Sequence, residues 1–379
     1  MLDRKAPSES NAKDNVRTEN DDASSITHII STNTEHEASP QLSIVDLEIQ
    51  DIEGIGPTTA RKLKESGIVS PMDLAAASAE ESAERINTSK ESAASLIIST
   101  QKLLRDSKVI EKEFVTAEVA LEKRKSMHRC STGSKALDEL LLGGIETQAV
   151  TEFYGEFGSG KSQICHTLCV TVRQPTSSGG LAGGTIYLDT EGTFRPERVE
   201  QIARARGLDH IQVLRGVSVC KVYNSSHLEL IVKDLGRYII EFKAKLVIID
   251  SIISLHRAEF AGRGTLADRQ QRLNSMLHRL VRLAEIFNIA IIITNQVQTS
   301  PDTFFGDPTK AAGGNILGHS PTYRIYLRKS GETRVARMID SPYHPYSDTR
   351  FTLNQKGTEG GTLRKGKTYC KKSVQAKME

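Results

Sequence analysis

The sequence GEFGSGKS at residues 155–162 contains residue types that bind phosphate groups. It fits the pattern G-x-x-x-x-G-K-[ST] and lies between a short apolar run and a helical pattern, which is the setting that this loop requires. Glycines let successive backbone N–H groups turn toward a triphosphate, and the N-terminus of the following helix adds positive potential. The Lys161 ammonium can neutralise the β- and γ-phosphates, and the Ser162 hydroxyl can coordinate Mg²⁺. The predicted nucleotide site comprises Gly155, Glu156, Phe157, Gly158, Ser159, Gly160, Lys161, Ser162 and Gln163.

Three polar residues follow apolar runs that are typical of strands. Asp250 ends KLVIID, where a carboxylate could hold a Mg²⁺-bound water, or could simply cap the next turn. Glu191, in YLDTEGTFRPER, should emerge at the same sheet edge as the phosphate loop, where it could orient or deprotonate water; the other interpretation is a solvated loop charge. Gln296 ends IAIIITNQ and could sense the γ-phosphate through its amide, although polar residues are common at strand ends.

The hydrophobic pattern predicts the elements that position these residues. Short β-branched runs, AVTEFY, TIYLD, IQVLRG, KLVIID and IAIIITN, alternate with helical patterns near residues 161–173, 196–206, 227–242 and 266–287. This alternation predicts an α/β fold with right-handed crossovers and a mainly parallel sheet covered by helices. The last of these helices should pack on the sheet through one apolar stripe. That stripe comprises Leu273, Leu277, Leu280, Ala284 and Phe287. Beyond residue 322, TYRIYLRKS, TRVARMID and RFTLN predict antiparallel strands that close one edge.

Composition divides the 379 residues into five parts. They are an acidic, polar tail expected to be disordered (1–46), a small all-helical domain (47–106), a charged linker (107–127), the α/β core (128–356) and a basic tail expected to be disordered (357–379). In the helical domain, Ser70 before Pro71 predicts an N-cap followed by proline at the first helical position.

Charge and cysteine content limit the classes of protein. Residues 1–50 hold four Lys/Arg and ten Asp/Glu, whereas residues 361–379 hold six and one, so the formal charge of +3 conceals an acidic and a basic end. Apolar runs fall short of a bilayer span and there is no signal-peptide core, so we expect a soluble, intracellular protein without a membrane partner. The cysteines form no CxxC pair and suggest neither a disulfide framework nor a zinc site. They are Cys130, Cys165, Cys169, Cys220 and Cys370.

Two glycine-rich polar segments interrupt the core. The first, EFAGRGTLADRQ, contains Arg263 and Arg269 and begins shortly after Arg257. The second runs over residues 297–318, includes Lys310, Gly313 and Gly314, and is expected to lack secondary structure. A loop of this length in a compact domain is usually functional or disordered.

Taken together and in order, GEFGSGKSQICH, LDTEGTFRPERVEQIA, LVIIDS, GRGTLADRQQ, ITNQV, FFGDPTKAAGGN and RIYLRKS resemble the RadA recombinases of archaea and their eukaryotic counterparts, within the RecA family. The resemblance covers about residues 47–353. It implies a RecA-like ATPase core that forms helical filaments on single-stranded DNA and uses ATP and Mg²⁺ for homologous pairing and strand exchange in recombination and repair. It leaves a K⁺ requirement open, and it implies recombination mediators or paralogues as partners and a cytoplasmic, nucleoid-associated location.

The resemblance also implies roles for single residues. Lys161, Glu191 and Gln296 would be catalytic, with Ser162 and Asp250 around the metal. Arg198 and Gln201, in FRPERVEQ, would contact the base or ribose. His319 and the segment DSPYHP, from Asp340 to Pro345, would reach the nucleotide of a neighbouring protomer, so that hydrolysis depends on assembly; the sequence itself favours no such contact, because Asp-Ser-Pro is ordinarily a turn.

DNA and self-assembly follow from the same resemblance. Both glycine-rich segments would line the filament axis and bind DNA, with arginines and Gly-Gly amides meeting phosphates. IEGIGPTTARKL resembles a helix-hairpin-helix in which Gly54, Gly56 and Arg61 approach duplex backbone, although a structural turn would use the same glycines. FVTA matches a polymerisation motif, in which Phe114 and Ala117 enter pockets of the adjacent core while an extended strand augments its sheet; otherwise Phe114 packs on its own domain.

Two other functions remain open at this point. A regulatory paralogue that binds ATP and DNA but acts mainly as an adaptor would often lack one or more of these motifs, all of which are present. A small-molecule kinase would share the phosphate loop, but it would need an acceptor pocket and a lid and would have little use for the glycine-rich segments.

Overall fold

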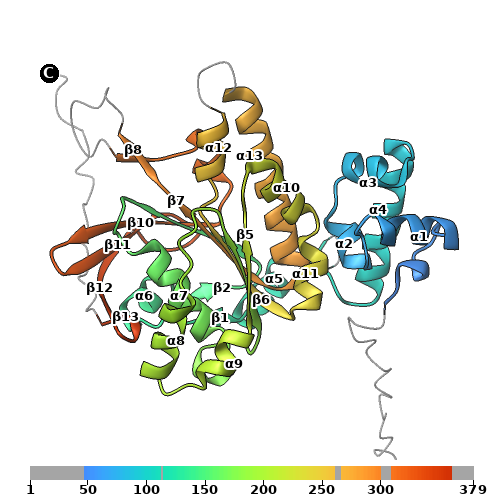
Figure 1. Cartoon of the computed structure of the whole chain (residues 1–379). Coiled ribbons are helices and arrows are strands. Elements are labelled where there is room, and N and C mark those ends of the chain that lie inside the picture. Colours follow the sequence, from blue (N-terminus) through green and yellow to red (C-terminus); the bar gives the residue numbers. More distant parts are fainter. Residues whose placement is uncertain (1–46, 112–113, 261–265, 300–308, 361–379) are drawn as a thin grey trace, which may run out of the picture. The chain divides into compact units, whose positions relative to one another are not determined.

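The computed structural model of the chain describes residues 47–111, 114–260, 266–299 and 309–360. Within these residues, a group of short helices precedes a mostly parallel sheet that is covered by further helices (Figure 1). None of the helices described combines the length and apolarity needed to traverse a bilayer. The predicted tail at residues 1–46, and residues 361–379 of the tail predicted at 357–379, lie outside the described residues.

The elements have the following bounds. The helices of the N-terminal region and linker are η1 (Ile49–Asp51), α1 (Pro57–Glu65), α2 (Pro71–Ala76), α3 (Ala79–Ile86), α4 (Lys90–Asp106) and α5 (Ala117–Lys125). The helices of the core are α6 (Lys135–Leu140), α7 (Lys161–Thr171), η2 (Thr176–Ser178), α8 (Pro196–Ala205), α9 (His210–Arg215), α10 (Ser225–Lys233), α11 (Leu235–Glu241), α12 (Ser254–Glu259), α13 (Leu266–Phe287) and α14 (Gly314–His319). The strands are β1 (Arg129–Cys130), β2 (Ile145–Glu146), β3 (Ala149–Gly155), β4 (Gly184–Asp189), β5 (Val217–Lys221), β6 (Ala244–Asp250), β7 (Ala290–Asn295), β8 (Val297–Thr299), β9 (Thr309–Ala311), β10 (Tyr323–Ser330), β11 (Thr333–Asp340), β12 (Asp348–Asn354) and β13 (Gly357–Glu359).

The main sheet has the order β13-β12-β11-β10-β3-β7-β6-β4-β5 in the described part of the chain. Strands β10, β3, β7, β6, β4 and β5 pair in parallel, whereas β11, β12 and β13 continue antiparallel. The register aligns Tyr154 with Asn295 and Asp189 with Asp250. The carboxyl ends of β3, β7, β6 and β4 therefore meet at one edge of the sheet, which we call the carboxyl edge, while β11 runs back to the opposite, amino edge.

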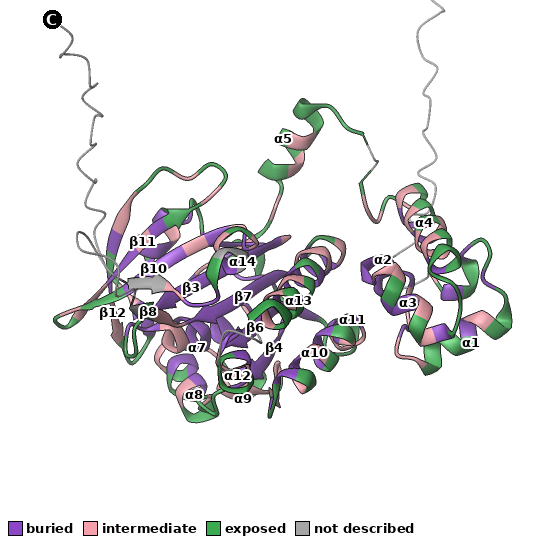
Figure 2. Ribbon diagram, turned by 90° about the horizontal axis from the view of Figure 1, so that it is seen from above, coloured by how far each residue is buried: buried purple, intermediate pink, exposed green. Residues whose placement is uncertain are grey.

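Alternate residues of the central strands pack into two different cores. In β6, Leu246 and Ile248 pack with α7 and α8, whereas Val247 and Ile249 pack with α10, α11 and α13. Burial on both faces explains why these strands read as continuous apolar runs. Figure 2 shows the sheet strands largely buried and the outer faces of the covering helices exposed. The predicted stripe of α13 is buried at all five of its positions, which confirms its packing role.

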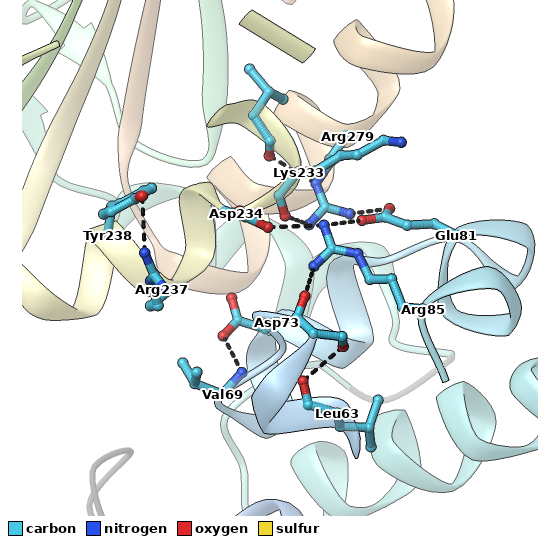
Figure 3. Close-up of polar contacts among 12 residues, drawn as sticks. Leu63, Val69, Asp73, Glu81, Arg85, Lys233, Asp234, Arg237, Tyr238 and Arg279 are labelled. Carbon is cyan, nitrogen blue, oxygen red and sulfur yellow. Dashed lines mark hydrogen bonds and ion pairs between the residues drawn. The ribbon is translucent and has the colours of Figure 1, made fainter. Parts of the chain in front are cut away.

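The N-terminal helices form their own apolar core and also contact the α/β core. Ser70 caps α2 by accepting from the Asp73 N–H, with Pro71 at the first helical position, as predicted. Across the contact, Arg279 of α13 donates to Glu81 of α3, and Arg85 donates to Asp234 at 2.9 Å (Figure 3). The Arg279–Glu81 pair is largely buried, so removing one partner would leave a buried charge unpaired and lower the free energy of unfolding by about 3–5 kcal/mol.

Several sequence predictions of local structure are wrong. IQVLRG was expected to be a strand, but it forms α9, because Asp209 accepts from the N–H groups of Ile211 and Gln212 and caps a helix there; the strand is the next segment, β5. The second glycine-rich segment was expected to lack secondary structure, yet β8 pairs with β9 and α14 follows.

Two boundaries also differ from the sequence expectation. Residues 227–242 contain two helices, α10 and α11, which meet at Asp234. Residues 357–359 were assigned to the basic tail, but they form β13 on β12, because Gly357 turns the chain back with a φ of 87° and the Thr358 hydroxyl donates to the Thr132 carbonyl. The linker contains an unpredicted helix, α5, which is capped by Thr116.

Candidate active site

The phosphate loop connects β3 to α7 at the carboxyl edge. Gly158 and Gly160 have φ values of 74° and 107°, a conformation that favours glycine, and a side chain on Gly158 would meet nothing within 4 Å. The Lys161 ammonium donates to the carbonyls of Gly155 at 2.9 Å and Glu156 at 3.0 Å. Burial lowers the pKa of Lys161, and the charges of Asp250 and Glu191 counter that effect. The loop is an open cradle of backbone and ammonium donors, which fits a polyphosphate.

Oxygen donors suited to Mg²⁺ lie beside this loop. Asp250 is buried, accepts from the Tyr187 hydroxyl at 2.7 Å through one oxygen and accepts from the Thr294 hydroxyl through the other. Each oxygen therefore keeps a lone pair for a metal-bound water. The described residues contain no cluster of three His, Cys, Asp or Glu side chains that could hold a metal alone. Ser162 with Asp250 fits Mg²⁺, which typically binds one or two protein oxygens together with phosphates and waters.

Glu191 is held by two donors on one of its oxygens. Its Oε1 accepts from the Ser251 hydroxyl at 2.8 Å and from the Gln296 amide nitrogen at 2.8 Å. The Gln296 amide oxygen in turn faces the Arg257 guanidinium at 3.4 Å. The structure thus brings together Glu191 at the end of β4, Gln296 at the end of β7, and an arginine beside the first glycine-rich segment.

The loops after β4 and β6 are tied together by residues that sequence reasoning missed. The Thr190 hydroxyl accepts from the Ser251 N–H at 2.7 Å and contacts the Ser254 hydroxyl at 2.8 Å. Asp189 accepts from the N–H groups of Glu191 and Thr193 and so shapes the loop that carries Glu191. The available signal was adjacency, since Thr190 and Ser251 directly neighbour the predicted Glu191 and Asp250.

The residues predicted to meet the base or ribose form one cluster. Arg198 donates to Gln163 at 2.8 Å and to Gln201, and it also reaches the Asn354 carbonyl. Burial lowers the pKa of the Arg198 guanidinium. Gln163 lies on α7 immediately after the phosphate loop, so this cluster joins α7 to α8.

The residues predicted to act on a neighbour's nucleotide lie elsewhere. Asp340 ends β11 and pairs with Arg324 in the register, which puts it at the amino edge, opposite the phosphate loop. Asp340 and Pro345 are both exposed. His319 is exposed at the end of α14, shortly before the start of β10. The strand directions therefore separate the residue 340–345 segment from the phosphate loop of its own chain.

The predicted DNA contacts in the core lie on the segments that leave the carboxyl edge. Arg257 is exposed on α12, and Arg269 is half-buried in the first turns of α13. Gly313 and Gly314 have φ values of 98° and 67°, and the Gly313 carbonyl accepts from Gln270 at 3.1 Å. Lys310 lies on β9. Arg263 lies outside the described residues.

The remaining predicted contacts are exposed. Gly54, with a φ of 90°, makes the turn before α1, Gly56 is the N-cap of α1, and Arg61 is exposed on that helix. In the linker, Phe114 is 92% exposed, and Ala117 begins α5. An aromatic ring exposed to this extent does not pack on its own domain, which argues against that alternative.

The fold and this site define a P-loop nucleotide-binding protein in which the phosphate loop, Asp250, Glu191 and Gln296 share one edge of a parallel sheet. Comparison with known proteins agrees: the Rad51 family matches residues 123–360, and the SAM-like tandem helix-hairpin-helix family matches residues 46–102. The chain is 48% identical over 319 residues, 84% of its length and 80% of the relative's, to "DNA repair and recombination protein RadA" of Cenarchaeum symbiosum (strain A). The chain belongs to the Rad51 family. The predicted fold class and family resemblance are confirmed.

Proposed function

We propose that this protein is a DNA-dependent ATPase that assembles into helical filaments on single-stranded DNA and catalyses homologous pairing and strand exchange, in the cytoplasm and on chromosomal DNA. The observation that carries the proposal is the convergence of the phosphate loop, Asp250, Glu191 and Gln296 at the carboxyl edge, from which both glycine-rich segments also depart. Membership of the Rad51 family and the similarity to a protein named for DNA repair and recombination support it.

Each residue at the carboxyl edge has a part in hydrolysis. Lys161 exchanges its two backbone acceptors for the β- and γ-phosphates. Ser162 and Asp250 would hold Mg²⁺, which when bound would supply positive charge against the phosphates. Because Ser251 and Gln296 occupy Glu191 Oε1, the second oxygen is left to accept a proton from the attacking water. Gln296 responds to the γ-phosphate through its amide.

Assembly completes the nucleotide site. The phosphate loop lies at one edge of the sheet, whereas the residue 340–345 segment lies at the other, so a head-to-tail arrangement brings the segment of one protomer over the nucleotide of the next, with His319 reaching its γ-phosphate. Heterologous contacts of this kind produce helical filaments. Phe114 and Ala117 anchor the contact, and β5, an edge strand with the exposed Val219, offers the neighbour an unpaired strand to extend.

DNA binding regulates the hydrolysis. Arginines of the first segment meet phosphates, and Arg257 also contacts Gln296, so its movement to DNA alters the group that holds Glu191. The turn at Gly54 and Gly56, together with Arg61, binds the phosphate backbone of duplex DNA without base specificity. Mediator proteins or paralogues act on the assembled filament.

Three measurements on purified protein test the proposal. ATP hydrolysis should rise when single-stranded DNA is added, filaments should be visible by negative stain, and a labelled oligonucleotide should exchange into homologous duplex. The variant Lys161→Ala should lose all nucleotide-dependent activity because the phosphates lose their ammonium. Absence of all three activities in the unmodified protein would reject the proposal.

A further inference from the structure

We infer that Glu146 is a positioning residue that fixes the linker helix α5 to the residue 340–345 segment, so that engaging a neighbour through the linker sets the closure over the neighbour's nucleotide. Glu146 is 3% exposed and accepts four hydrogen bonds, from α5, β1, β10 and the turn after β11. The donors are Arg124 at 2.9 Å, Tyr323 at 2.8 Å, Arg129 at 2.8 Å and Tyr343 at 3.2 Å. This inference rests on the proposed function.

The carboxylate of Glu146 is a fully used acceptor. Its Oε1 accepts hydrogen bonds from Arg124 and Tyr323, and its Oε2 accepts hydrogen bonds from Arg129 and Tyr343. Burial would raise the pKa of this carboxyl, but the Tyr323 hydroxyl and the two arginines hold it below its ordinary value. A buried charge that is paired and fully hydrogen-bonded fixes the geometry of its donors, because any displacement leaves polar groups unsatisfied.

One end of this network is the linker. Arg124 lies near the end of α5, and that helix begins at Ala117, after Phe114, Val115 and the N-cap Thr116, with Phe114 exposed. A helix transmits displacement as a rigid element, so a pull on Phe114 by a neighbouring core acts on Arg124. The Arg124 guanidinium also lies over the Tyr343 ring, 5.1 Å from its centroid. Arg124 therefore contacts both the carboxylate and the far end of the network.

The other end is the segment proposed to cover the neighbour's nucleotide. The Ser341 hydroxyl accepts from the N–H groups of Tyr343 and His344 and holds them in one turn. The His344 ring lies 4.4 Å from Tyr343 and 5.1 Å from Tyr323, centroid to centroid. The turn rests on Glu146 through these rings and the Tyr343 hydroxyl, so its placement depends on the same carboxylate that holds α5.

The test uses a double-mutant cycle at the two ends. Arg124→Gln removes the guanidinium that joins α5 to Glu146, and Tyr343→Phe removes only the hydroxyl that joins the 340–345 segment to Glu146. In DNA-stimulated hydrolysis, each single variant should raise the KM for ATP about threefold to tenfold, with kcat within about twofold of the original. The double variant should raise KM no further than the stronger single variant, because both break one link. Lys123→Gln is the matched control, since Lys123 pairs with Glu111 instead.

The Phe114→Glu background separates coupling from folding. A chain that cannot engage a neighbour has nothing to cover, so Arg124→Gln and Tyr343→Phe should leave its affinity for a fluorescent ATP analogue unchanged. Reduced affinity in that background, or a double variant equal to the product of the singles, would overturn the inference. If the unmodified protein neither assembles nor hydrolyses ATP, the proposed function itself fails; if it does both and the variants match it, only the role of Glu146 fails.

Discussion

Replacing Ser251 with alanine should slow ATP hydrolysis without weakening ATP binding. The Ser251 hydroxyl donates to Glu191 Oε1 at 2.8 Å, and a hydrogen bond to a charged group contributes about 1.5–3 kcal/mol. Glu191 is exposed and keeps the Gln296 donor on the same oxygen, so solvent screening reduces the contribution to the lower limit of that range or slightly below it, about 1–1.5 kcal/mol. At about 1.4 kcal/mol per tenfold change, kcat should fall about fivefold to tenfold.

The assay is steady-state hydrolysis at saturating single-stranded DNA, with kcat and KM determined separately. Ser254→Ala is the matched control, because the Ser254 hydroxyl contacts Thr190 in the same network but has no contact with Glu191 among the described residues. We expect Ser254→Ala to retain kcat within about twofold. Equal losses in both variants, or a loss in KM alone, would refute the idea that Ser251 orients the water-activating carboxylate.

Two further predictions concern stability and assembly. Burial raises the pKa of Asp73 from 3.8 to about 6, so the folded state binds this proton more tightly than the unfolded state and loses stability as the pH rises through that interval. The unfolding free energy of Asp73→Asn, minus that of the unmodified protein, should therefore rise by about 2 kcal/mol between about pH 4 and pH 7 in urea titrations, and a difference independent of pH would contradict the reasoning. Because Phe114 is 92% exposed, Phe114→Glu should change the free energy of unfolding by less than about 0.5 kcal/mol. The variant should nevertheless be monomeric in size-exclusion chromatography. Oligomers of undiminished size would show that the linker is not the assembly contact.

The sequence was most informative where local pattern and burial coincide. The phosphate loop needs a strand, glycines and a helix in immediate succession, so its position could be predicted from residues 155–162 alone. The central strands are buried on both faces, and their apolar runs identified β3, β4, β6 and β7. Asp250 and Glu191 could then be placed together because parallel strands end at one edge.

Prediction failed where one local contact or a distant partner decides the outcome. Ile211 and Val213 gave IQVLRG the pattern of a strand, but the Asp209 cap favours a helix in the same residues. The role of Ser251 depends on a bond to Glu191 that spans 60 positions, and the donors of Glu146 range from Arg124 to Tyr343. No periodicity or spacing encodes such contacts, because they exist only after the sheet has formed.

The central claim is that one protomer holds the nucleotide and the next completes the site, and mixing two defective variants tests it most directly. Glu191→Gln removes the carboxylate proposed to activate water. The double variant Asp340→Ala, Pro345→Ala alters the segment proposed to cover the neighbour's nucleotide. Each should be inactive alone in DNA-stimulated hydrolysis, whereas an equimolar mixture should recover about a quarter of the original rate, because a random head-to-tail neighbour restores about one site in four. A mixture no more active than the average of its two components would contradict the account.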